Sequence, residues 1–145
     1  MQPPSHTHVL LLRAAGRACA LPLGSVVETL RPLPIQILAG APFYISGVAL
    51  VRGEPTPVID LGVLLGGAKQ DPSRFVRLRL GERAAALAVD QILGVRTLDA
   101  SNGGLPPLLR GVADETLSSL ETLDEQLLWV LRDSVTLPET AWPAS

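Results

Sequence analysis

The 145-residue sequence has little of what several classes of protein require. Its one cysteine, Cys19, excludes a disulfide within the chain and a cysteine-rich zinc site. Its two histidines, His6 and His8, both stand in the proline-rich N-terminal stretch, so a catalytic triad would lack an internal histidine. Because no third metal ligand accompanies these histidines, we expect a solvated tail there and not a metal site.

Strong charge and aromatic clusters are also missing. The chain has 12 basic and 14 acidic side chains, a net charge of -2, and no long run of either sign. We therefore expect no electrostatic binding of nucleic acid or anionic lipid, and the few aromatic residues offer little for base stacking. The longest apolar runs reach only about five residues, too few to cross a membrane. With no signal-peptide core at the N-terminus, we expect a cytoplasmic protein.

Thirteen glycines and 13 prolines interrupt the sequence, which favours short strands and turns over a helix bundle. Val9–Ala14 and Ala18–Leu23 flank a glycine-containing turn and predict a β-hairpin. Val48–Val51 and Thr56–Asp60 predict a second hairpin, in which Gly53 supplies the positive φ of a tight turn. The prolines beside that turn place the following strand at a sheet edge or at a strand start, because proline cannot donate to a ladder.

A short helix is expected at Leu61–Leu65, after which the pattern begins again. The first hairpin returns at an offset of 66 residues, which aligns Arg17 with Arg83. The second returns at an offset of 72, which aligns Val58-Ile59 with Val130-Leu131. We predict a disordered tail at residues 1–7, one domain at residues 8–138 and a second tail at residues 139–145. The domain consists of two pseudo-repeated halves, at about residues 8–66 and 74–138.

The last segment supports two interpretations. Its leucines at positions 117, 120, 123, 127 and 131 have the spacing of an amphipathic helix. The repeat instead makes Asp124-Glu125 a turn between strands at Leu120–Thr122 and Leu127–Leu131. We follow the repeat and predict a hairpin there, with the longer loop of the second half at residues 101–104.

The sequence offers no catalytic constellation. Phosphate-binding glycine loops are missing, and Cys19 in its apolar strand is expected to be a small core residue. Asp60 and Asp90 have the chemistry of an acid–base pair. Both, however, end strands just before a turn or helix, where a carboxylate caps free N–H groups. We therefore expect no enzyme, no cofactor and no metal.

The second hairpin resembles the most diagnostic stretch of the CheW family, whose pattern is roughly G-V-x-N-L-R-G followed by P-V-x-D-L. The matching residues are Gly47-Val48-Ala49-Leu50-Val51-Arg52-Gly53 and Pro57-Val58-Ile59-Asp60-Leu61. Ala20–Leu23 with Val26 and Glu28, and later Leu87–Ile92, are similar to further family stretches in the right order. Leu50-Val51 stands where Asn-Leu is usual, which removes a polar side chain from the hairpin.

The resemblance covers about residues 8 to 138 and implies a fold, a role and partners. The implied fold is mainly β, with two intertwined five-stranded SH3-like β-barrels and short helices. The implied role is a non-enzymatic cytoplasmic adaptor that couples chemoreceptor signalling tips to the regulatory domain of the histidine kinase CheA. Such an adaptor is recruited to membrane-associated receptor arrays without inserting into the membrane, and it exposes an apolar patch at a barrel end for the kinase.

The resemblance also implies site residues. The receptor-binding candidates are Arg52, Val26, Glu28, Gly47 and Val48. The turn and structural candidates are Gly53, Asp60 and Asp90.

Other interpretations stay open. Arg52 is alternatively an exposed turn residue in an ion pair with Glu54 or Glu28. Val26 and Val48 suit a core as well as an interface, and Gly47 suits a conformational role. The alternative functions are a small-molecule-binding β-barrel and a CheW-like scaffold of a non-motility chemosensory pathway.

Overall fold

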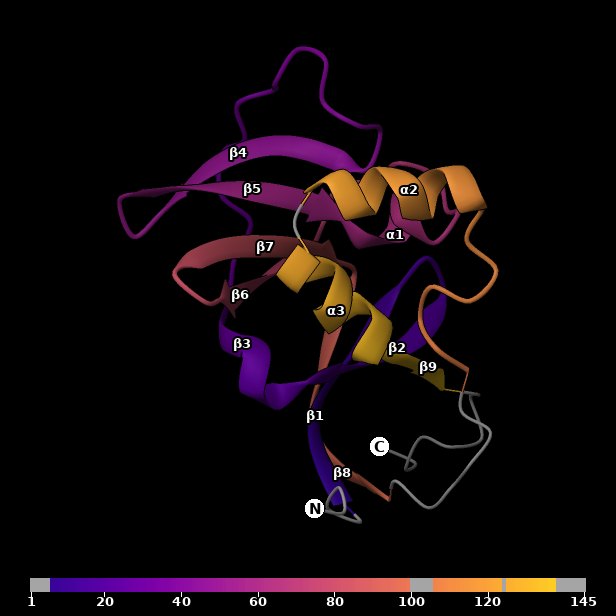
Figure 1. Cartoon of the computed structure of the whole chain (residues 1–145). Coiled ribbons are helices and arrows are strands. Elements are labelled where there is room, and N and C mark those ends of the chain that lie inside the picture. The colour runs from indigo at the N-terminus through magenta and orange to yellow at the C-terminus, as the bar shows by residue number, and fades with distance from the viewer. Residues whose placement is uncertain (1–5, 100–105, 124, 138–145) are drawn as a thin grey trace.

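The computed structural model describes residues 6–99, 106–123 and 125–137 of the chain (Figure 1). The strands are β1 His6–Ala14, β2 Arg17–Pro22, β3 Val26–Leu30, β4 Ile45–Val51, β5 Glu54–Asp60, β6 Arg74–Leu80, β7 Arg83–Val89, β8 Gln91–Asp99 and β9 Val135–Leu137. The helices are α1 Leu61–Leu64, α2 Asp114–Leu123 and α3 Glu125–Asp133, with one turn of 3-10 helix at Leu23–Ser25.

The strands form two sheets that exchange hairpins. One sheet has the order β8-β1-β2-β9 and the other the order β3-β6-β7-β5-β4. The β1–β2 hairpin from the first half of the chain thus lies between strands of the second half. The β6–β7 hairpin lies, in turn, among strands of the first half. This arrangement confirms the expected mainly β, intertwined architecture, although one sheet has four strands in the described part of the chain.

The three hairpins predicted from glycine-containing turns are confirmed. Two-residue loops join β1 to β2, β4 to β5 and β6 to β7. The prediction for the prolines of β5 holds in part. β5 is an interior strand between β7 and β4, but β7 pairs only with Val58–Asp60. Pro55 and Pro57 therefore lie at the strand start, where no partner on the β7 side needs their missing N–H group.

The predicted hairpin at Leu120–Thr122 and Leu127–Leu131 is wrong. These residues belong to α2 and α3. The helical spacing decides the outcome, because it places Leu120, Leu127, Leu128 and Leu131 together in the core. Acidic residues in the first turn of each helix add favourable interactions with the helix dipole.

The internal repeat is therefore shorter than expected. β1, β2 and β3 have counterparts in β6, β7 and β8, in agreement with the offset of 66 residues. The repeat predicted at an offset of 72 residues is wrong. The second half has the helices α2 and α3 where the first half has the β4–β5 hairpin, and it has the strand β9 where the first half has α1. The expected longer loop at residues 101–104 lies outside the described residues.

The limits of the folded chain differ slightly from the expectation. β1 begins at His6, so residues 6 and 7 belong to the sheet and not to a tail. His8 is an exposed residue of the same strand, and its Nδ1 lies 3.1 Å from Thr97 Oγ1 of β8. Residues 1–5 and 139–145, the remainder of the two expected tails, lie outside the described residues.

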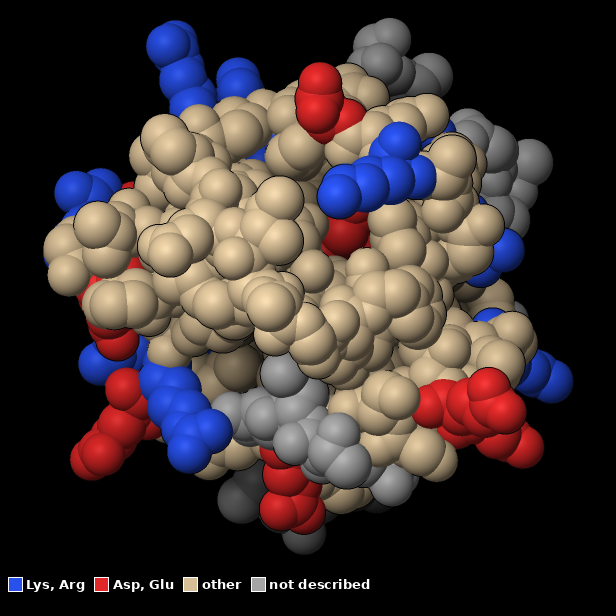
Figure 2. Space-filling view, turned by 90° about the horizontal axis from the view of Figure 1, so that it is seen from above, with Lys and Arg blue, Asp and Glu red and all other residues tan. Residues whose placement is uncertain are grey.

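A connection without regular structure runs from residue 31 to residue 44, as its prolines predict, and passes above β4 in Figure 1. It covers part of the outer edge of β4 through one bridge. The N–H of Gln36 donates to the carbonyl of Val48 at 2.8 Å, and the N–H of Val48 donates back at 2.9 Å. Seen from above, this side of the molecule is a broad face with few charged side chains (Figure 2).

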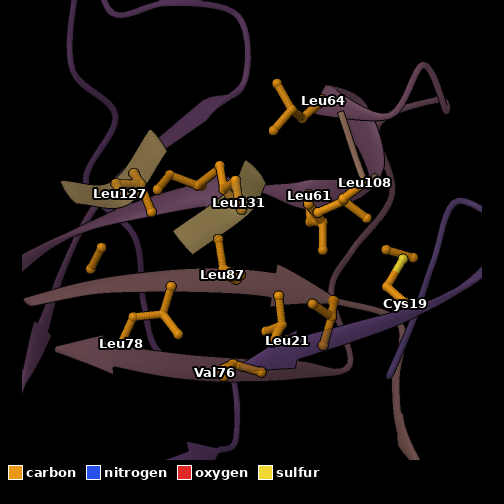
Figure 3. Close-up of a cluster of buried hydrophobic side chains, with 14 of the residues drawn as sticks. Cys19, Leu21, Leu61, Leu64, Val76, Leu78, Leu87, Leu108, Leu127 and Leu131 are labelled. Carbon is orange, nitrogen blue, oxygen red and sulfur yellow. The ribbon is translucent and has the colours of Figure 1, made fainter. Parts of the chain in front are cut away.

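Three apolar clusters follow from the two-residue period of the strands. Leu10 and Leu12 of β1 face the largest cluster, which lies where the two sheets and α3 meet. Val9 and Leu11 of the same strand face a separate cluster on the other side of the four-stranded sheet. Figure 3 shows Leu127 and Leu131 of α3 above Leu87 of β7 in the largest cluster, with Cys19 at its margin.

The third cluster shows that the five-stranded sheet is curled. Phe75 and Ala86 from the middle strands pack with Val51 of β4, one edge of the sheet. Leu30 of β3, the opposite edge, packs against the same group. The two edges of this sheet therefore share one interior, as in a small barrel.

Candidate functional site

The β4–β5 turn presents the first candidate residue, Arg52. Arg52 and Gly53 both have positive φ, 50° and 78°, which is the pattern of a type I′ hairpin turn. Gly53 adopts this conformation without steric cost, in agreement with its predicted turn role. A non-glycine residue at positive φ is uncommon, so the backbone holds Arg52 at the tip of the hairpin by a conformation that arginine does not favour.

Glu28 reaches the same place through an irregularity in β3. The register between β3 and β6 shifts between Val26 and Glu28, so that Glu28 lies opposite Arg77. A bulge of this kind re-aims the side chains that follow it. Val26 packs against the largest apolar cluster, whereas Val27 is exposed. The structure thus places the half-buried Val26 against the core and brings Glu28 to the hairpin tip.

Four charged side chains meet at this end of the curled sheet. Arg52 Nε donates to Glu28 Oε2 at 2.9 Å, and Arg52 Nη2 donates to Glu28 Oε1 at 2.7 Å. Arg77 Nη1 donates to Glu28 Oε2 at 3.2 Å, and Arg77 Nη2 donates to Glu54 Oε2 at 3.2 Å. We call these residues, Glu28, Arg52, Glu54 and Arg77, the charged mouth. The alternative interpretation of Arg52, an ion pair with Glu28, is confirmed as a contact.

The electrostatics of the charged mouth favour ionised groups. The hydrogen bonds from Arg52 are the largest cause that lowers the pKa of Glu28 from 4.5 to about 2, and those from Arg77 add to the effect. The Glu28 carboxylate in turn raises the pKa of Arg52. The side chain of Arg52 is nevertheless 71% exposed. It is therefore a fixed, solvent-facing cation with N–H groups beyond the two that Glu28 uses.

The candidates on β4 are not part of the charged mouth. Gly47 is buried, and a Cβ at this position would overlap the carbonyl oxygen of Gln36. Its φ of 148° also lies in the range that favours glycine. Val48 is half-buried and bridges to Gln36, roughly 13 Å along the strand from Arg52 at about 3.3 Å per residue. Gly47 thus has a conformational role, and receptor binding by either residue stays a prediction.

Asp60 and Asp90 satisfy backbone groups. Asp60 Oδ1 accepts from the N–H of Val63 at 3.0 Å and caps α1, as predicted. Asp90 Oδ2 accepts from the N–H of Ala15 at 3.2 Å, in the turn between β1 and β2. Asp90 therefore stabilises a hairpin turn and not a helix, since another strand, β8, follows it. Both carboxylates line one surface hollow of about 240 Å³.

Other chemistry is limited in the described residues. Cys19 is fully buried, and burial raises the pKa of its thiol to about 12, which confirms its role as a core residue. Residues 6–99, 106–123 and 125–137 contain no group of three or more His, Cys, Asp or Glu placed to hold a metal ion. Within the same ranges, no helix has the length and apolar character that a membrane-spanning helix needs.

The family resemblance implies an exposed apolar patch, but the sequence reasoning did not name the residues that form it. From Pro32 to Val51 the chain has no Asp, Glu, Lys, Arg or His. Four large apolar side chains of this stretch are nevertheless exposed, namely Ile37 (79%), Leu38 (46%), Phe43 (63%) and Leu50 (65%). We call them the apolar surface. The uncharged stretch is readable in the sequence, but only the fold shows that its side chains face solvent.

Arg77 and Glu54 were also missed as members of the charged site. Arg77 stands in an alternating strand, where every second residue faces one side, but the sequence does not show which side closes over Glu28. Glu54 was considered only as a local partner of Arg52. In the structure it pairs instead with Arg77, from the far side of the turn.

Comparison with known proteins agrees with this fold. The sequence model of a protein family, the CheW-like domain, matches residues 8–137. Protein PilI of Pseudomonas aeruginosa is 33% identical over 101 residues, which cover 66% of this chain and 57% of PilI, so the chain spans little more than half of that relative. The crystal structure of the scaffolding protein TtCheW from Thermoanaerobacter tengcongensis has a TM-score of 0.62 at 26% identity, covering 70% of this chain and 71% of that chain. The family match over most of the chain shows that the protein belongs to the CheW-like domain family, and its fold is similar to that of a scaffolding protein.

Proposed function

We propose that this protein is a cytoplasmic coupling adaptor that binds a chemoreceptor signalling tip and the regulatory domain of the histidine kinase CheA at the same time. The observation that carries the proposal is the pair of unlike surfaces on one small domain. The charged mouth offers a fixed cation, and the apolar surface offers exposed aliphatic and aromatic side chains. Two partners of different chemistry can therefore be held without competing for the same residues.

The charged mouth suits the receptor tip. Arg52 is held in plane by Glu28 and keeps N–H groups directed to solvent. A planar guanidinium fork binds a carboxylate or the carbonyl groups at a helix end. Because Glu28 already fixes the side chain, less conformational entropy is lost when a partner binds. These properties support the assignment of Arg52 and Glu28 as receptor-binding residues.

The apolar surface suits the kinase. Contiguous exposed apolar patches on soluble proteins commonly mark interaction sites. Figure 2 shows the face on this side with charged groups mainly at its rim. Leu50 adds to it, since this sequence has leucine where the family pattern has asparagine. Loss of the polar residue thus enlarges the apolar surface, and we expect CheA's regulatory domain to dock there without nucleotide.

Filled interiors count against a small-molecule-binding barrel. The interior of the curled five-stranded sheet is occupied by Phe75, Val51 and Val58, all fully or almost fully buried. The side of the four-stranded sheet that faces away from the largest cluster is covered by its own apolar group, which includes Val9, Leu11 and Leu137. A ligand-binding barrel needs a cavity with convergent polar groups.

The test uses the full chain, a cognate receptor-tip fragment and the regulatory domain of CheA. Titration calorimetry is run for each pair at micromolar to tens-of-micromolar protein, a range that corresponds to about 6 to 8 kcal/mol of binding free energy. Leu50→Glu places a charge in the apolar surface and should abolish binding to the kinase domain. Leu50→Asn restores the usual family residue and changes the apolar surface less than Leu50→Glu does, because asparagine is polar but uncharged.

The proposal requires that the wild-type chain binds both fragments and that Leu50→Glu loses only the kinase domain. A control, Val95→Glu, introduces the same charge at an exposed apolar residue of β8, remote in sequence from the apolar surface. It should leave both affinities within twofold. If the wild-type chain gives no heat of binding with the kinase domain and does not co-elute with it, the adaptor assignment is contradicted.

A further inference from the structure

Arg77 is the most enclosed member of the charged mouth. Its side chain is 12% exposed, compared with 71% for Arg52, 22% for Glu28 and 45% for Glu54. It extends from β6, which pairs with β3 on one side and β7 on the other. Its guanidinium donates to Glu28 through Nη1 and to Glu54 through Nη2. A single side chain thus holds two carboxylates from different parts of the fold.

The contact with Glu28 fixes the partner of Arg52. Glu28 Oε2 accepts from both arginines, and Glu28 Oε1 accepts from Arg52. With Arg77 on one side, the carboxylate keeps both oxygens turned toward Arg52. The two parallel hydrogen bonds from Arg52 require this orientation. If the Glu28 carboxylate could rotate freely, it would contact Arg52 in many geometries. Fixing any one of these geometries would then cost conformational entropy.

The contact with Glu54 fixes the turn itself. Glu54 is the first residue of β5 and comes directly after the Arg52-Gly53 loop. Arg77 therefore contacts the residue that follows the turn and, through Glu28, the side chain that projects from it. Both the base and the end of the Arg52 side chain depend on one largely enclosed cation, Arg77.

We propose that Arg77 is a positioning residue for partner binding, which holds Glu28 and Glu54 so that the guanidinium of Arg52 presents its remaining N–H groups in one fixed orientation. This inference rests on the proposed receptor contact of Arg52. Arg77 itself does not touch the partner, since it lies beneath the two carboxylates. Its influence on binding passes entirely through Arg52.

The experiment compares three variants of the full chain. Arg77→Met removes the charge and the donors and keeps an unbranched stem. Arg77→Lys keeps the charge but cannot bridge two carboxylates with a planar fork. Arg79→Met removes the same charge from the exposed arginine two residues further along β6 and controls for net charge.

The first measurement needs no partner. The NMR signal of the Arg52 Nε–H should be sharp and slow to exchange in the wild type and in Arg79→Met, because this proton is bonded to Glu28. It should broaden or disappear in Arg77→Met and stay intermediate in Arg77→Lys. An unchanged Arg52 signal in Arg77→Met would overturn the positioning role.

The second measurement is the affinity for the receptor-tip fragment. Arg77→Met should weaken it roughly fivefold, within the range known for coupled neighbours in one ion-pair network. Arg79→Met should stay within twofold. In a chain that already carries Arg52→Ala, the further change Arg77→Met should have no effect, because the side chain that it positions is gone. Equal weakening in both backgrounds would overturn the inference.

The two measurements separate the inference from the proposed function. If Arg52→Ala leaves receptor binding intact, the proposed receptor contact fails. Loss of the Arg52 signal in Arg77→Met would still support the positioning of Arg52 by Arg77. If the Arg52 signal is unchanged while Arg52→Ala abolishes binding, the receptor contact holds and the positioning role fails.

Discussion

Arg52 and Glu28 come from opposite edges of one five-stranded sheet, and Arg52 Nη2 nevertheless lies 2.7 Å from Glu28 Oε1. Arg52 follows the edge strand β4, and Glu28 lies in the edge strand β3. The contact is possible because the sheet curls around Phe75 and its neighbours, so that side chains of both edge strands pack against one apolar cluster. An ion pair thus spans the two edge strands at the end where the proposed receptor contact lies.

The pH dependence of stability follows from Glu28. Its pKa in the folded protein is about 2, below the ordinary 4.5, mainly because of the hydrogen bonds from Arg52. A carboxylate with a lowered pKa contributes stability above its unfolded pKa and loses that contribution as the pH falls through the folded pKa. We expect urea midpoints to fall between about pH 4.5 and pH 2, and to fall less in Glu28→Gln. An equal fall in wild type and Glu28→Gln would show that other carboxylates carry the effect.

Gly47 is expected to be intolerant of any side chain. Gly47→Ala places a Cβ against the carbonyl of Gln36 and forces alanine to a φ of 148°. We expect a loss of at least about 2 kcal/mol in the free energy of unfolding. Gly24→Ala, in open space and without a positive φ, is the matched control and should change stability little. If both variants are equally stable, the bridge between Gln36 and Val48 does not form in solution.

Tyr44 carries a hydroxyl that no described group satisfies. The side chain is fully buried, its oxygen has no hydrogen-bond partner among residues 6–99, 106–123 and 125–137, and burial raises the pKa of the phenol. An unsatisfied buried polar group costs about 1–3 kcal/mol. Tyr44→Phe should therefore keep or raise the urea midpoint, whereas Tyr44→Ala should lower the free energy of unfolding by about 3–5 kcal/mol. A marked loss of stability in Tyr44→Phe would reveal a partner for the hydroxyl.

Cys19 should be inert toward thiol reagents. It is fully buried in β2, and the pKa of about 12 leaves almost no thiolate at neutral pH. We expect labelling by a disulfide reagent at pH 8 to be at least a hundredfold slower than in urea-unfolded protein, roughly in line with the thiolate fraction. Rapid labelling of the folded chain would show that the core at β2 opens readily.

Much of the fold could be predicted because the relevant signals are local. Glycine-containing turns between apolar runs predicted the β1–β2, β4–β5 and β6–β7 hairpins, and Asp60 predicted the cap of α1. The C-terminal segment failed because two local signals disagreed there. The helical spacing of Leu120, Leu127 and Leu131 outweighs an apparent repeat, because it lets all three leucines pack into the largest apolar cluster.

The site could be predicted only in part. Arg52 and Glu28 were placed in one group by the family pattern, and the structure brings them into contact. Arg77 was missed, because its role depends on a bulge in β3 and on the curl of the whole sheet. The bulge also separates Val26 from the charged mouth, whereas Gly47 is separated from it by its distance along β4. Long-range geometry of this kind has no signature in a short stretch of sequence.

The central claim is that Arg52 binds the receptor and is not required for the fold. Affinities of Arg52→Ala for the receptor-tip fragment and for the regulatory domain of CheA, measured beside its melting temperature, test it most directly. We expect a melting temperature within about 5 °C of wild type, because an exposed ion pair contributes little to folding. Kinase binding should be unchanged, receptor binding should be weakened, and Arg52→Glu should weaken it further through repulsion of an acidic partner. Unfolding of Arg52→Ala with intact receptor binding would contradict the account and make Arg52 a structural residue.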